Sequence, residues 1–236
     1  MPREEYDSFL KSLAMAEALL ELERASFSNP PKKDERDSVQ GLRGGAVVLM
    51  VASFEYYLRS LMAAVVEDIT SGPNAVEFGD LPDQMQVTSI FEGLQLATKG
   101  ARYGPPPPKK DRIPEIKTIC SKILAGNVIH QAFSDTSSNP NSQVVKGMFK
   151  NLGIRDVFSE IKRKFETRGR WNGAVADTFI SDKLDEIVAN RHVVAHTAKT
   201  LDLTRSDLKE SIKFLRILAE LLALKANKHI ESLRST

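Results

Sequence analysis

The sequence predicts an all-α fold. Over long stretches, apolar residues recur at steps of three and four, which is the spacing of one face of an α-helix. Pairs of segments that alternate apolar and polar residues are missing, and the short apolar run at residues 46–50 lies inside a longer helical pattern. With 236 residues, 42% of them hydrophobic, the chain can bury a sizeable core. We therefore expect one all-α domain over residues 1–236.

Two helices are expected in the N-terminal part. The first covers residues 6–22, and Asn29, Pro30 and Pro31 follow it as helix-stopping residues. Its apolar face is formed by Phe9, Leu13, Ala16 and Leu20. The second helix covers residues 42–69, where apolar residues are dense enough to predict burial on most of its surface.

The middle of the chain has a shorter and more interrupted pattern. Helices are expected near residues 84–99, 114–133 and 144–167. The four consecutive prolines at 105–108 favour an extended conformation and predict a stiff spacer. We interpret residues 75–180 as a helical insertion within the single domain.

The C-terminal part predicts two more helices. One is capped by Ser181 or Asp182 and continues its buried face to Arg191. The other starts at a capping box formed by Thr204 and Asp207 and runs to about residue 232. Its apolar positions alternate four and three apart, which suits packing in an antiparallel bundle or at a subunit interface. These positions are Leu208, Ile212, Leu215, Ala219, Leu222 and Ala226.

Composition predicts a soluble, cytoplasmic protein. The N-terminus lacks the order of a secretory signal, and no window approaches the ~18 apolar residues needed to span a bilayer. The single cysteine, Cys120, cannot form an internal disulfide and is expected to be buried, which fits a reducing compartment. A net charge of +2 is too small to indicate a nucleic-acid partner by itself.

The run from Asn190 to His196 is the stretch best suited to chemistry. Arg191 supplies a permanent cation, and His196 can exchange a proton near neutral pH. One alternative is purely structural: Arg191 pairs with a carboxylate on a neighbouring helix. Another is a metal site, since His192 and His196 are four residues apart. A zinc protease would have glutamate where this chain has Val193, so we expect no metal and no cofactor.

The motif resembles that of the HEPN superfamily, whose helical bundles carry an arginine, four to six residues and a histidine. The run is similar to the version found in bacterial groups such as RiboL-PSP-HEPN, and residues 203–208 resemble the start of the last helix in those groups. Residues 51–59 resemble an early helix of the same groups, in which Glu55 is a candidate partner for Arg191. Many relatives have glycine after the motif histidine, where this chain has Thr197.

The resemblance implies a HEPN-type helical bundle and a metal-independent endoribonuclease. Arg191 and His196 would be catalytic, with His192 and Asn190 supporting the phosphate. It also implies a homodimer whose two motifs share one cleft, acting as a toxin or phage-defence effector held in check by an antitoxin or another defence-system protein. The alternative is a non-catalytic HEPN-like dimer that binds RNA, a nucleotide or a protein.

An RNA partner needs a surface that follows its phosphates. An excess of positive charge in residues 146–170 predicts such a patch, with an adjacent indole that can stack a base; an ordinary solvated helix face remains the alternative. The candidate contacts are Lys162, Arg163, Lys164, Arg168, Arg170 and Trp171.

Overall fold

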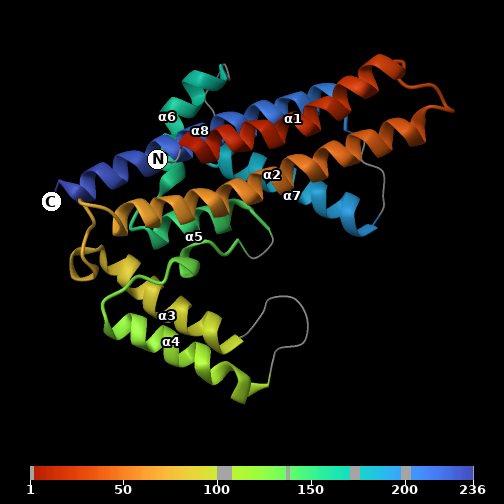
Figure 1. Cartoon of the computed structure of the whole chain (residues 1–236). Coiled ribbons are helices and arrows are strands. Elements are labelled where there is room, and N and C mark those ends of the chain that lie inside the picture. Colours follow the sequence, from red (N-terminus) through yellow and green to blue (C-terminus); the bar gives the residue numbers. More distant parts are fainter. Residues whose placement is uncertain (1–2, 100–107, 137–138, 171–175, 198–202, 236) are drawn as a thin grey trace.

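The fold is all-α, as the sequence predicts. In the computed structural model the described residues are 3–99, 108–136, 139–170, 176–197 and 203–235; the side chains of Arg3, His196 and Thr197 lie outside the description. Eight α-helices and three short 3-10 helices occupy these ranges, and none of the ranges contains a strand (Figure 1).

Four long helices form the central bundle. These are α1 (Arg3–Ser26), α2 (Arg36–Thr70), α7 (Phe179–Thr197) and α8 (Arg205–Arg234). Helices α1 and α7 run in one direction, and α2 and α8 run in the opposite direction (Figure 1). The apolar positions predicted for the first and last of these helices are all buried, so the bundle interpretation of the α8 pattern is confirmed.

Helix α2 is the centre of the bundle and contacts α1, α7 and α8. The buried Tyr57 of α2 donates a hydrogen bond of 2.6 Å from its hydroxyl to the carbonyl of Ala219 on α8. By length and composition α2 could cross a membrane, with a mean hydropathy of 1.3 over its best window. The expectation that no window qualifies was therefore wrong. Because 56% of that stretch is buried, packing in the core of the bundle accounts for its apolar sequence.

The four remaining helices lie outside this bundle. Helices α3 (Asp83–Lys99) and α4 (Ile113–Leu124) pack against each other, while α5 (Ser142–Asn151) contacts α7 and α6 (Val157–Gly169) contacts α8 (Figure 1). The start of α5 is fixed by Ser142, whose backbone N–H and hydroxyl donate to the Asp185 carboxylate at 2.7 and 2.8 Å.

Several predicted boundaries were wrong. Helix α2 begins at Arg36, six residues before the expected start. The helix expected at 114–133 ends at Leu124, and that expected at 144–167 is two helices, because the chain turns at Gly126 and Gly153 with φ of +72° and +92°. Helix α7 begins at Phe179, so Ser181 and Asp182 lie in its first turn and do not cap it. Acidic residues are favourable both just before a helix and within its first turn, so the sequence alone could not tell whether Asp182 caps the helix or lies inside it. Cys120 is half-buried, less than expected.

A fully buried carboxylate joins three helices at one end of the bundle. Glu23 on α1 is 0% exposed and accepts hydrogen bonds from Arg43 on α2 and Arg205 on α8. The same two guanidinium groups donate to backbone carbonyls, Arg43 to Leu203 at 2.8 Å and Arg205 to Phe27 at 2.9 Å. This Glu23 cluster (Glu23, Arg43, Arg205) therefore fixes the end of α1 and the start of α8 onto α2.

We expect Glu23→Gln to lower the free energy of unfolding by about 3 kcal/mol, because it leaves two partly buried cations without their counter-charge. Urea unfolding followed by circular dichroism measures the change. Glu21→Gln is the matched control: Glu21 is an exposed acid on the same helix, paired with Arg24, and its loss should cost less than about 1 kcal/mol. Equal effects of the two substitutions would contradict the structural role of Glu23.

A second prediction concerns pH. Burial lowers the pKa of His229 from its usual 6.5, and its Nε2 lies 2.6 Å from the Leu152 carbonyl between α5 and α6. A histidine whose folded pKa is lowered binds its proton more readily in the unfolded chain. Its contribution to stability is present above pH 6.5 and falls as pH drops below that value. His229→Gln should flatten the dependence of unfolding free energy on pH between about 7 and 5. An unchanged slope would contradict it.

Candidate active site at the end of the bundle

The motif lies in the last two turns of α7. Ile180, Leu184, Ile187 and Val188 form the buried face of this helix, and Arg191 follows them at helical spacing. Arg191 is half-buried. Its Nε is buried without a hydrogen-bond partner, and no described residue forms an ion pair with it. The structural alternative, in which Arg191 pairs with a carboxylate of its own chain, therefore has no support among the described side chains.

Close contact with α2 fixes the position of the motif. A Cβ built on Gly44 of α2 would lie 3.1 Å from Cγ1 of Val194, so the two helices approach closely at this level. The backbone of α7 remains helical through His196 to Thr197. Thr197 is thus still helical, and the His196 side chain lies outside the described part of the chain.

The expected ion pair between Glu55 and Arg191 is not found. One carboxylate oxygen of Glu55 accepts a hydrogen bond of 2.8 Å from the hydroxyl of Thr136, which is fully buried. Val194 of α7 lies opposite Gly44 of α2, and the two helices are antiparallel. With a rise of 1.5 Å per residue, Glu55 and Arg191 are therefore about 12 Å apart along the bundle axis. The sequence placed both residues on helices but could not give this register.

The other motif residues are accessible to different degrees. His192 is exposed and Asn190 is half-buried. Within the described ranges, no group of three His, Cys, Asp or Glu side chains is arranged to hold a metal ion. Because the His196 side chain is outside those ranges, this finding does not extend to it.

The predicted basic patch is partly neutralised within the molecule. Lys162 pairs with Asp177 and Glu166, and Arg168 pairs with Glu220 on α8. The hydrogen bond to Asp177 is the main cause that raises the pKa of Lys162. Arg163, Lys164 and Arg170 are exposed, while Trp171 lies outside the described residues. Helix α6 therefore offers fewer available cations than its sequence indicates.

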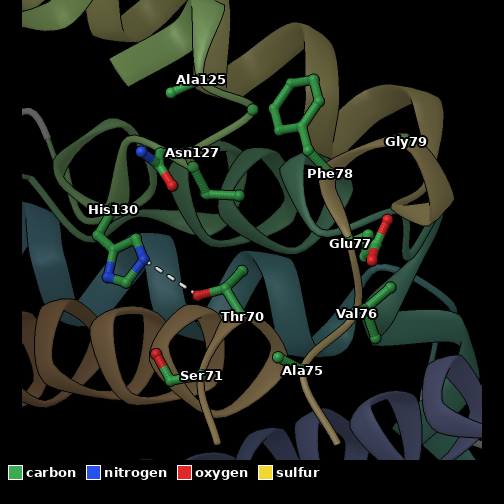
Figure 2. Close-up of a pocket in the computed structure, with 12 residues that line it drawn as sticks. Thr70, Ser71, Ala75, Val76, Glu77, Phe78, Gly79, Ala125, Asn127 and His130 are labelled. Atoms are coloured by element: carbon green, nitrogen blue, oxygen red, sulfur yellow. Dashed lines mark hydrogen bonds between the residues drawn. The ribbon is translucent and has the colours of Figure 1, made fainter. Parts of the chain in front are cut away.

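A cavity of about 690 Å³ lies beyond the other end of α2, away from the motif (Figure 2). His130 projects from its wall, with Nε2 at 3.0 Å from the Thr70 hydroxyl and Nδ1 at 3.0 Å from the Glu67 carboxylate. Thr70 is 26 residues from Gly44 on α2, about 39 Å along the helix. This cavity is too distant to share a substrate phosphate with Arg191, and periodicity gave no sign of it.

The bundle and its Arg-x4-His motif at the end of α7 define the chain as a protein of the HEPN class. The sequence profile of the RiboL-PSP-HEPN family matches residues 11–228. The chain therefore belongs to this family. The match also covers the middle of the chain, where we had found no resemblance. No curated protein and no solved structure matches the chain. Family membership indicates a ribonuclease or nucleotide-binding function.

The contact between Gly44 and Val194 yields a prediction about the motif helix. Gly44→Leu should lower the free energy of unfolding by about 2 kcal/mol, because the added side chain overlaps Val194. Amide hydrogen exchange in residues 191–196 should become faster as α7 is displaced. In Gly41→Leu, the matched control, the new Cβ meets nothing within 4 Å, so stability should be kept or slightly raised. Equal stability of the two variants would show that α7 is not held there.

Proposed function

We propose that this protein is a metal-independent HEPN endoribonuclease, a cytoplasmic toxin or phage-defence effector. The observation that carries the proposal is Arg191, a half-buried guanidinium with an unsatisfied Nε at the end of a HEPN bundle. Leaving a buried donor unpaired costs about 1–3 kcal/mol, and a functional site completed by a bound group is one recognised reason for such a donor. A phosphate, the group that arginine recognises with two parallel hydrogen bonds, is the ligand that fits this reaction.

The chemistry follows from the two side chains. A neutral His196 imidazole takes the proton from a ribose 2′-hydroxyl, and the 2′-oxygen attacks the adjacent phosphorus. The bond to the 5′-oxygen breaks, and that oxygen takes a proton from a protonated imidazole. Arg191 offsets the negative charge that grows on the phosphoryl oxygens. The products are a 2′,3′-cyclic phosphate and a 5′-hydroxyl, and the reaction needs no metal.

Two imidazoles serve this reaction better than one, since one must accept a proton while the other donates. A two-fold homodimer with facing motifs would supply both, because symmetry brings equivalent residues together. His192 and Asn190 would then border the scissile phosphate. Glu55, engaged with Thr136, would support the fold of α2 and would not touch Arg191.

The test is cleavage of single-stranded RNA in excess chelator. The wild-type protein should cleave and leave 5′-hydroxyl ends, whereas His196→Ala should lose at least a hundredfold in kcat. Arg191→Lys keeps the charge but not the paired hydrogen bonds, so it should lose most of the activity as well. Circular dichroism must show that these variants are folded, and sedimentation should give twice the mass of one chain.

Intact RNA after incubation with the folded wild-type dimer would refute the nuclease proposal. If RNA binding persisted in that case and was unchanged in His196→Ala, the alternative of a non-catalytic HEPN adaptor would replace it. A loss of cleavage in chelator, restored by a divalent metal, would instead favour the histidine-metal hypothesis.

A further inference from the structure

We propose that a cleft at the start of α2 holds an RNA phosphate a few nucleotides from the scissile one, with Arg36 as the contacting cation. This inference rests on the proposed function, because it names the part of the molecule along which the substrate strand leaves the motif. In this proposal the cleft, and not the basic face of α6, is the main surface that the RNA contacts.

The cleft is formed where α2 begins and where the chain enters α8. It has a volume of about 440 Å³. Its described lining residues are Pro31, Arg36, Val39, Gln40, Arg43, Leu203 and Thr204. The Glu23 cluster fixes its inner wall, because Arg43 binds both the Glu23 carboxylate and the carbonyl of Leu203. The wall is therefore preorganised, and a ligand entering it would not have to order these residues.

Only two of the described lining residues carry a charge, and both are arginines. Arg43 is neutralised by Glu23, with an N–O distance of 2.8 Å. Arg36 is exposed and forms no ion pair with a described residue. Both sequence neighbours of Arg36 are acids. Glu35 accepts hydrogen bonds from Ser28 and from the backbone N–H of Lys32, which lower its pKa and hold it in its own loop. Asp37 is exposed and forms no ion pair with a described residue. An exposed guanidinium at the mouth of this cleft suits a phosphate.

The cleft lies at the same end of the bundle as the motif. Val194 meets α2 at Gly44, and Gln40 and Arg36 follow about 6 and 12 Å further toward the start of that helix. Arg191 lies on the other side of this level, so Arg36 and Arg191 are about 16 Å apart along the bundle axis. Leu203 and Thr204 belong to the segment that leads from the motif helix into α8. A strand with its scissile phosphate at Arg191 can therefore reach Arg36 with a nucleotide a few positions further along, while the Gln40 amide can donate to or accept from the strand between them.

The test measures RNA binding separately from cleavage. The binding variants are made in a His196→Ala background, and the dissociation constant of a labelled single-stranded RNA oligonucleotide is followed against KCl. Arg36→Ala should raise the dissociation constant about tenfold and make the log-log salt slope shallower by about 0.7, the loss of one phosphate contact. Arg36→Lys should keep the slope. Arg59→Ala, which removes an exposed arginine on the same helix, is the matched control and should change the constant less than twofold.

Each outcome has a distinct meaning. If wild type cleaves RNA but Arg36→Ala binds as tightly as the control, the cleft inference is wrong and the nuclease proposal stands. If wild type does not cleave but Arg36→Ala weakens binding as expected, the nuclease proposal fails and the cleft remains an RNA site. If Arg163→Ala and Lys164→Ala weaken binding while Arg36→Ala does not, the strand crosses α6 and the inference is overturned. No RNA binding at low salt would also overturn it.

Discussion

The carboxylate of Glu23 is the constraint on which the motif end of the bundle depends. It lies fully buried among α1, α2 and α8 and accepts hydrogen bonds from two guanidinium groups. Burying one carboxylate costs several kcal/mol, so this position is stable only while both arginines remain. Those arginines also bind the carbonyls of Leu203 and Phe27. One acid thus fixes three helices and the loops between them.

This constraint acts on the segment that follows the motif. Leu203 is held by Arg43, and the next residue, Thr204, opens a capping box in which its hydrogen bonds lower the pKa of Asp207. On the other side, Val194 is held against Gly44. The motif histidine lies between these anchors, within the last turn of α7. Contacts on both sides of it therefore fix the chain at Val194 and at Leu203.

Periodicity predicted the helices well but could not predict their long-range partners. The heptad pattern of α8 and the apolar face of α1 gave the buried residues directly, because their spacing matches the helix repeat. Spacing does not reveal which polar residue faces the core, so Glu23, one residue beyond the helix expected at 6–22, was not singled out. A single sequence also does not show which residues of two distant helices lie side by side. For that reason Glu55 was expected to pair with Arg191, whereas in the structure it binds Thr136. The motif itself was found because its chemistry is local.

Arg191 lies where the buried face of α7 ends. One and two turns earlier, the same face of α7 carries Val188 and Leu184, which are 4% and 0% exposed. A guanidinium at either position would need a buried acid, as Arg43 and Arg205 do. At the end of the helix it can keep its stem among apolar residues and direct its charge outward. Glu23 supplies the negative charge needed by the arginines that hold the fold together. Among the described residues no acid pairs with Arg191, which is why it stands as the candidate cation of the proposed site.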